Sequence, residues 1–362
     1  MRRRFEINAK ARAVSNPLQQ GLDDIVAAVK AGASIGGEVS GEQWVFCRSS
    51  GSTGSPKVIR RAPESWIASF EVNQSLFGLS DQDVVATLGT LEHSLTLYAV
   101  LEALHLGMDV LCLHGVGPKT QTAKLARATV LYTTPAQLKR LLTVEQRQIP
   151  ELRLILSGGG KLDLACRTGL RQLAPNARVV EFFGASESSF VTMSDETTPI
   201  GSVGKAYPEV NFQIDGGELW VKSPYLFDGY EGTEGDARWR DGFLNVGEMA
   251  STDDAGNLTL LGRVDRMITI ADQNVFPEAI EAALLQNEGV SHAAVLPRPD
   301  EMRGHRLVAV IEGAAMPGLA KELRERFGSM VAPKEIIEVQ EMPLLPAGKP
   351  DLRVLAQWLE KR

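Results

Sequence analysis

The sequence has little of what marks secreted, membrane-spanning or nucleic-acid-binding proteins. Cysteine occurs three times, at Cys47, Cys112 and Cys166, without the Cys-x-x-Cys spacing of a metal or redox site. We interpret the three as reduced and mostly buried thiols, which favours a cytoplasmic protein. The basic start, Met1 to Arg4, is not followed by the apolar segment of a signal peptide. No apolar run reaches the ~20 residues of a transmembrane helix.

The charge balance also excludes a class of partner. The formal net charge is −7 and no long basic run occurs, so we do not expect nucleic acid as a partner. The hydrophobic content of 44% and charged content of 23% are typical of a globular chain, and 362 residues are enough for two domains or more. An acidic chain that binds a polyphosphate must concentrate its cations locally. Single lysines and arginines beside motifs are therefore candidate site residues.

A loop rich in serine and glycine is the most informative feature present. It contains the candidate phosphate-binding residues Ser49, Ser50, Gly51, Ser52, Thr53, Gly54 and Lys57. Glycines allow close approach of the backbone to an anion, successive amides can form an anion-binding nest, and the lysine adds a positive charge. The order of residues is not that of a Walker A loop. A flexible Ser/Gly linker is the alternative interpretation.

Hydrophobic patterning predicts an α/β fold. Apolar segments typical of strands and amphipathic segments typical of helices alternate between residues 63 and 182, which indicates a mainly parallel sheet with flanking helices. Predicted helices cover residues 22–29, 63–77, 95–106, 135–142 and 164–173. Predicted strands cover residues 84–88, 109–113, 130–132, 152–157 and 179–182. We place this alternation in a large N-terminal domain, residues 1–264.

The pattern changes near residue 200. Residues 200–262 are rich in glycine and in short β-like runs, which predicts a β-rich subdomain with hairpin turns near residues 215–217 and 254–257. Shorter strand and helix patterns return after Arg263, and they predict a small α+β C-terminal domain, residues 265–362. We predict the domain boundary at residues 264–265.

Five motifs in order identify a family resemblance. The serine-rich loop is followed by Phe182-Phe183-Gly184-Ala185-Ser186-Glu187-Ser188, by Val246-Gly247-Glu248, by Gly262-Arg263-Val264-Asp265-Arg266 with Asn274-Val275-Phe276-Pro277, and by Pro346-Ala347-Gly348-Lys349. From about residue 45 onward the chain resembles the acyl-adenylate-forming superfamily, which includes the AMP-forming acyl-CoA synthetases. The resemblance implies activation of a carboxylic acid by ATP, with release of pyrophosphate, followed by transfer of the acyl group to a thiol.

The resemblance also implies roles for individual residues. The loop would hold the β- and γ-phosphates, Glu187 would bind Mg²⁺, and the hydroxyl of Ser186 would reach the α-phosphate. Lys349 would be the catalytic cation, and Asp265 would be the hinge about which a mobile C-terminal domain rotates. The implied nucleotide-binding residues are Gly158, Gly159, Phe183, Gly184, Glu248 and Arg263.

Two of these assignments compete with structural roles. Phe183 occupies the position of an aromatic residue that stacks on adenine, but plain core packing is the alternative. His93 matches a position at the acyl-binding pocket of many relatives, beside an apolar stretch that includes Leu95 and Leu97. A lone histidine is also commonly structural.

Three departures from the family pattern affect the interpretation. Only 48 residues precede the phosphate loop, which resembles the compact form of some o-succinylbenzoate-CoA synthetase-like proteins. Glu248 replaces the aspartate that binds the ribose hydroxyls, so we expect ATP binding to be kept but weakened. Asp272 replaces a glycine beside which the pantetheine arm of CoA passes, so we expect its carboxylate to hinder transfer to CoA and not adenylation.

The sequence therefore leaves three functions open. The leading one is an AMP-forming acid–thiol ligase that uses ATP, Mg²⁺, a small carboxylic acid and CoA. In the second, the acyl group goes instead to the phosphopantetheine of an acyl or peptidyl carrier protein. The third is a non-catalytic nucleotide-binding homologue. The identity of the acid stays open, as does formation of a homodimer, and we expect no membrane partner.

Overall fold

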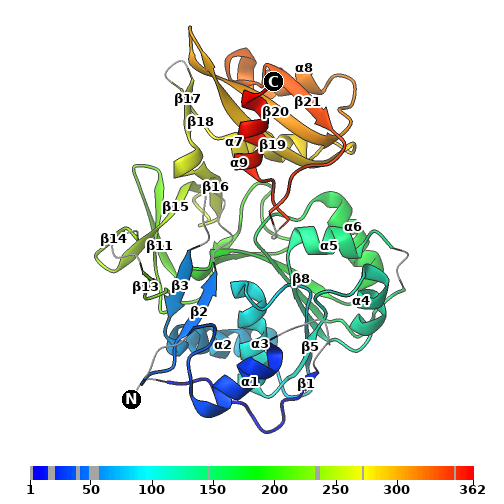
Figure 1. Cartoon of the computed structure of the whole chain (residues 1–362), viewed down its shortest axis with the longest axis vertical. Helices are drawn as coiled ribbons and strands as arrows, with labels where there is room; N and C mark the ends of the chain where they lie inside the picture. The colour runs from blue at the N-terminus through cyan, green and yellow to red at the C-terminus, as the bar shows by residue number, and fades with distance from the viewer. Residues whose placement is uncertain are drawn as a thin grey trace.

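The chain forms a large lower lobe and a small upper lobe in the computed structural model (Figure 1). The structure describes residues 3–14, 21–37, 41–48, 57–144, 147–232, 237–270, 273–345 and 348–362. The N-terminal part of the chain builds the lower lobe. The segment after residue 265 builds the upper lobe (Figure 1).

The largest sheet in the described part of the chain has eight strands, in the order β1-β5-β4-β6-β7-β8-β9-β10. Six of them are parallel: β1 (Ala13–Val14), β5 (Asp109–Cys112), β4 (Val84–Thr87), β6 (Val130–Thr133), β7 (Leu154–Gly158) and β8 (Arg178–Ala185). β9 (Ser189–Ser194) and β10 (Lys205–Ala206) extend the sheet in antiparallel fashion. Every residue of β6 and β7 is buried, as expected for parallel strands covered on both faces. The predicted α/β fold class is confirmed.

Helices cover the two faces of this sheet. On one face pack α1 (Leu22–Ala31), α2 (Pro63–Phe77) and α3 (Ser94–Leu106), and on the other pack α4 (Pro118–Leu125), α5 (Pro135–Leu141) and α6 (Leu164–Leu173). The bounds of α2 and α6 agree with the sequence prediction because a proline begins α2 and the Asp163 side chain caps α6. The sequence analysis missed α4 and β9, whose apolar patterns are short.

The N-terminal segment adds an edge strand that the sequence analysis also missed. The two residues of β1 pair in parallel with β5, and the Arg12 guanidinium lies 2.8 Å from the Asp109 carboxylate. A strand of two residues carries no readable periodicity, so only the tertiary structure reveals it.

Two further sheets form the β-rich part of the lower lobe. One contains β2 (Val45–Arg48), β3 (Val58–Arg61) and β13 (Gly229–Tyr230). The other contains β11 (Asn211–Asp215), β12 (Glu218–Lys222), β15 (Phe243–Thr252), β14 (Trp239–Arg240) and β16 (Leu258–Arg263). The predicted hairpins are present, because β11 pairs with β12 and β15 pairs with β16.

The upper lobe is a small α+β unit. It contains η1 (Val264–Arg266), β17 (Ile268–Ile270), β18 (Gln273–Val275), α7 (Pro277–Leu284), β19 (Val290–Asp300), β20 (Gly304–Gly313), α8 (Leu319–Val331), β21 (Glu335–Val339) and α9 (Leu352–Glu360). Asp265 lies in η1, between β16 and β17, and its role as a domain boundary and hinge stays a prediction. Among the described residues, no helix has the length and apolar character needed to cross a membrane.

Candidate active site

The candidate site lies near the ends of strands from the eight-stranded sheet and from the sheet of β2, β3 and β13. Of the predicted phosphate loop, Ser49, Ser50, Gly51, Ser52, Thr53 and Gly54 lie outside the described residues, as does Asp272. The loop's neighbours are described: β2 ends at Arg48, and Lys57 precedes β3 directly. The Lys57 ammonium lies 4.6 Å from the centre of the Tyr230 ring on β13.

Ser186 and Glu187 lie in the tight turn between β8 and β9. Gly184 makes this turn possible, because a Cβ atom there would lie 1.8 Å from the carbonyl oxygen of Ser189. The Ser188 hydroxyl accepts a hydrogen bond from the Ala185 amide at 3.0 Å and fixes the turn further. The Glu187 carboxylate accepts a hydrogen bond from the Tyr230 hydroxyl at 2.9 Å.

A buried arginine holds the backbone of the same turn. The Arg61 guanidinium on β3 donates to the carbonyl oxygen of Ser186 at 2.7 Å and to that of Tyr225 at 3.0 Å. Arg61 is fully buried, and this burial lowers its pKa to about 10. The strand that follows the phosphate loop is thereby bonded directly to the candidate catalytic turn.

Ser94, the neighbour of His93, contacts this turn from another side, and His93 itself bridges to Arg48 at the end of β2. His93 is the N-cap residue of α3, and the Ser94 hydroxyl lies 2.8 Å from the Ser186 hydroxyl. Burial lowers the pKa of His93, which favours the neutral imidazole at neutral pH. The structure thus brings His93 to the predicted site, while its contact with an acyl group stays a prediction.

Gly158, the last residue of β7, contacts Phe182 on the neighbouring strand β8. A Cβ atom on Gly158 would lie 2.2 Å from Cζ of Phe182, so the ring of Phe182 packs directly on this glycine. Gly159 has a φ of 81°, a conformation that glycine adopts without strain. Phe183 is half-buried, and like Phe182 it packs against the edge of the same core cluster. Adenine stacking by Phe183 stays a prediction.

Glu248 and Arg263 pair across β15 and β16. Arg263 Nη1 lies 3.5 Å from Glu248 Oε1, and Arg263 Nε donates to the Asp265 carboxylate at 2.9 Å. Burial raises the pKa of Glu248 to about 7, although the positive charges of Arg263 and Lys349 favour its ionised form.

Lys349 enters this cluster from the upper lobe. Gly348 lies against α5 of the lower lobe, since a Cβ atom on Gly348 would lie 2.8 Å from the Cβ of Ala136. Figure 1 shows the segment after β21 descending to the lower lobe before α9 begins. The Lys349 side chain reaches solvent, but the surrounding protein lowers its pKa, an effect that Arg263 adds to and Glu248 opposes. The charge of Lys349 therefore acts on the candidate ribose-binding residues in this conformation.

Sequence reasoning missed three residues of this site. Arg61, Ser94 and Tyr230 contact the candidate catalytic turn, but none stands in a motif that we used. Arg61 carried a weak signal, since a charged residue at the end of an apolar strand next to the loop requires a partner when it is buried.

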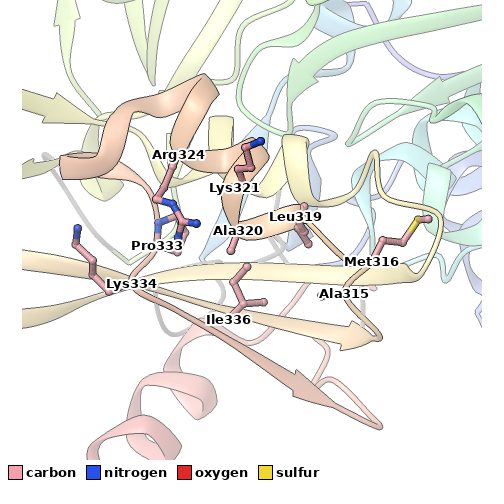
Figure 2. A pocket seen from close by; sticks show the side chains of 10 residues that line it. Ala315, Met316, Leu319, Ala320, Lys321, Arg324, Pro333, Lys334 and Ile336 are labelled. Carbon is pink, nitrogen blue, oxygen red and sulfur yellow. The ribbon is translucent and has the colours of Figure 1, made fainter.

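A separate cationic pocket lies in the upper lobe. Its volume is about 510 Å³, and its lining, drawn in Figure 2, includes the cationic Lys321, Arg324 and Lys334 and the apolar Leu319 and Ile336. The residues that line it in the described part of the chain include no acidic one. Burial and the nearby positive charge of Arg303 lower the pKa of Lys334. The lining therefore carries net positive charge, and one of its cations, Lys321, also pairs with Glu325 at 3.6 Å.

Comparisons with known proteins agree with this geometry. Residues 40–231 match the family model of the AMP-binding enzyme, and residues 279–349 match that of the AMP-binding enzyme C-terminal domain. The uncharacterized acyl-CoA ligase YhfT of Bacillus subtilis is 32% identical over 329 residues, which cover 86% of this chain and 68% of that protein.

Two solved structures share the fold. ATP-bound MatB from Rhodopseudomonas palustris superposes with a TM-score of 0.77 at 24% identity, over 87% of this chain and 68% of that one. The o-succinylbenzoate coenzyme A synthetase MenE of Bacillus subtilis, solved with ATP and magnesium, gives a TM-score of 0.76 at 22% identity, over 86% and 69%.

The fold, the site and the family models together define an AMP-binding enzyme. The chain belongs to the AMP-binding enzyme family, with matches to its main domain and its C-terminal domain. The resemblance predicted from the five motifs is confirmed, and so is the predicted class of enzyme, the AMP-forming ligases.

Proposed function

We propose that this protein activates a small carboxylic acid with ATP to form an acyl-adenylate and then transfers the acyl group to CoA. The main support is the position of Lys349: its neighbour Gly348 lies against α5 of the lower lobe, and the Lys349 charge acts on Glu248 and Arg263. A cation in this place can stabilise the negative charge that develops when a carboxylate attacks the α-phosphate. In the first step the acid's oxygen bonds to the α-phosphorus and pyrophosphate leaves.

The residues of the lower lobe would bind and orient the nucleotide. Lys57 and the preceding loop would hold the phosphates, and Glu248 with Arg263 would bind the ribose hydroxyls. The Ser186 hydroxyl, already 2.8 Å from that of Ser94, would donate to a phosphate oxygen. His93, beside the same turn, would face the acyl group. Most of the catalytic effect would come from positioning and charge stabilisation.

The chemistry of the site fits a magnesium ion bound together with ATP. Mg²⁺ is commonly held by one or two carboxylates plus phosphate oxygens rather than by a protein cage. Glu187 supplies such a carboxylate, and the described residues contain no cluster of three or more His, Cys, Asp or Glu side chains suited to a metal. The ion would neutralise phosphate charge.

The cationic pocket supports CoA as the acceptor. CoA carries several phosphates, and Lys321, Arg324 and Lys334 would attract such groups while Leu319 and Ile336 contact apolar parts. In the second step the CoA sulfur attacks the acyl carbon and the thioester bond forms. The C–O bond to AMP breaks, AMP leaves with its electron pair, and the thiol proton passes to solvent. Asp272 opposes this assignment, because its carboxylate would repel the phosphates of CoA.

Two other functions stay as alternatives. Asp272 favours transfer to the phosphopantetheine of an acyl or peptidyl carrier protein over transfer to CoA. Glu248, in place of an aspartate, motivates a non-catalytic nucleotide-binding role, which the presence of Lys57, Glu187 and Lys349 opposes. All three cysteines are free and buried, which supports our inference of a cytoplasmic enzyme.

The test is acid-dependent release of pyrophosphate from ATP and Mg²⁺ over a panel of aromatic, branched and medium-chain acids, with and without CoA. Release together with an acyl-CoA product, identified by mass spectrometry, would support the ligase. Release without acyl-CoA would favour a carrier protein. No release with any acid, together with intact ATP binding by titration, would favour the non-catalytic alternative.

A further inference from the structure

Tyr230 contacts two candidate site residues of opposite charge. Its hydroxyl donates to Glu187 Oε1 at 2.9 Å, and its ring lies under the Lys57 ammonium at 4.6 Å from the ring centre. We propose that Tyr230 is a positioning residue, which orients the Glu187 carboxylate for the metal ion and the Lys57 ammonium for the phosphates of ATP. This inference rests on the proposed function, because that function places Glu187 at the metal and Lys57 at the phosphates.

The hydroxyl contact limits the freedom of the Glu187 side chain. A free glutamate on a tight turn can adopt several rotamers, and ordering it costs conformational entropy at the moment of binding. A hydrogen bond from Tyr230 fixes Oε1 and leaves the lone pairs of Oε2 for another partner. The carboxylate is therefore oriented before a metal arrives, which should raise its affinity.

The ring contact acts on Lys57 by a different interaction. The negative face of an aromatic ring attracts an ammonium ion within about 6 Å of its centre. Tyr230 thus attracts the Lys57 side chain toward β13, the strand whose Tyr230 hydroxyl also bonds Glu187. Lys57 is the first described residue after the serine-rich loop, so its placement bears on the phosphate-binding end of the site.

The fold holds Tyr230 in this position from two sides. Its backbone pairs with Ile59 on β3, the strand that follows Lys57. Its ring meets the edge of Phe227 at a centroid distance of 5.0 Å, and the amide of Phe227 donates to the carbonyl oxygen of Glu187 at 2.8 Å. The tyrosine is therefore anchored to both segments whose side chains it contacts.

Arg61 supports the backbone of the turn, whereas Tyr230 contacts the side chain of Glu187. The structural role and the positioning role therefore belong to different residues. Arg61 bonds the carbonyl oxygens of Ser186 and Glu187, at 2.7 and 3.4 Å. Loss of the Tyr230 hydroxyl would thus leave the path of the turn in place and would free mainly the Glu187 carboxylate. A variant without the hydroxyl should fold normally and fail in metal-dependent binding.

The test compares Tyr230→Phe, Tyr230→Leu and a matched control, Tyr225→Phe. The Tyr225 hydroxyl donates to the carbonyl oxygen of Pro208 at 2.9 Å, away from Glu187, so the control removes the same atom elsewhere. Calorimetric titration measures the Kd of ATP in excess Mg²⁺ and in EDTA, without any acid substrate. Thermal melting checks that each variant is folded.

We expect Tyr230→Phe to weaken binding of magnesium-ATP about ten-fold and to change binding of metal-free ATP less than about two-fold. Tyr230→Leu should weaken metal-free ATP as well, by about two- to five-fold, because it also removes the ring under Lys57. Tyr225→Phe should match the wild type in both titrations.

Three results would overturn the inference. Unchanged magnesium-ATP binding in Tyr230→Phe would remove any role for the hydroxyl. Equal losses of ATP affinity in excess Mg²⁺ and in EDTA in that variant would show that the role of the Tyr230 hydroxyl is structural. Absence of ATP binding by the folded wild-type protein would instead refute the proposed function, and the inference with it.

Discussion

Arg263 and Glu248 face each other across two antiparallel strands, with Nη1 and Oε1 3.5 Å apart. Lys349 adds a second positive charge to Glu248 from the other lobe. The charges of two cations thus act on one carboxylate where the two lobes join, and the ionisation state of that carboxylate decides whether their attraction is present.

The ionisation of Glu248 should make ATP binding depend on pH. Its pKa lies near 7, so the carboxylate is largely protonated at pH 6 and ionised at pH 8. An ionised carboxylate accepts stronger hydrogen bonds from the ribose hydroxyls. We expect the affinity for ATP to rise over this range in the wild type and to stay flat in Glu248→Gln. Titrations at several pH values measure this, and a parallel rise in the variant would assign the effect to another group.

Lys349→Ala should reduce acyl-adenylate formation about 100-fold or more, because it removes a cation that acts in the transition state. ATP binding should change little, since the phosphate loop and Arg263 are retained. Single-turnover assays of adenylate formation and ATP titrations separate the two effects. Lys361→Ala is the control, since it removes an exposed lysine just after α9. Adenylation at the wild-type rate would refute the role of Lys349.

The cationic pocket should affect the second half-reaction alone. In a double variant, Arg324→Ala with Lys334→Ala, we expect the KM for CoA to rise about ten-fold, as loss of two charged phosphate contacts predicts. The rate of pyrophosphate release without CoA should stay within about two-fold of the wild type, because the pocket is proposed to contact CoA and not ATP. An unchanged KM for CoA would separate this pocket from the acceptor.

Glu102 should make the stability of the lower lobe fall as pH rises. It is fully buried on α3 and accepts hydrogen bonds from Asn73, Tyr98 and Tyr132. Burial raises its pKa from 4.5 to about 7, so between these values the folded state keeps a proton that the unfolded state has lost. Stability should therefore decline from pH 4.5 to about 7, by roughly 3 kcal/mol, and then level off.

The variant Glu102→Gln tests this pH dependence, because glutamine resembles the protonated acid and does not ionise. Denaturant unfolding at pH 5.5 and pH 8 should show a smaller loss of stability in the variant than in the wild type. Glu360→Gln, on the exposed end of α9, provides the control. An equal loss in Glu102→Gln and the wild type would show that Glu102 is not the titrating group.

The sequence by itself determined the architecture and most of the residues proposed for the chemistry. The apolar run Val130–Thr133 identifies a buried strand, and the proline at the first turn marks the start of the helix at Pro63. Both signals depend only on neighbouring residues, so the sequence is enough to recognise them. Motifs led to Glu187, Glu248, Arg263 and Lys349 because each stands beside glycines and in a fixed order along the chain.

Only the tertiary structure decided which side chains meet. Arg61, Ser94 and Tyr230 reach the turn at Glu187 from three distant segments, and no local pattern records such a contact. The same holds for Lys349, whose approach to Glu248 depends on how the two lobes pack. Periodicity reports which face of an element is buried, but packing decides which residues far apart in sequence become partners. Burial is then the largest cause of the shifts in the pKa of Glu248 and Arg61.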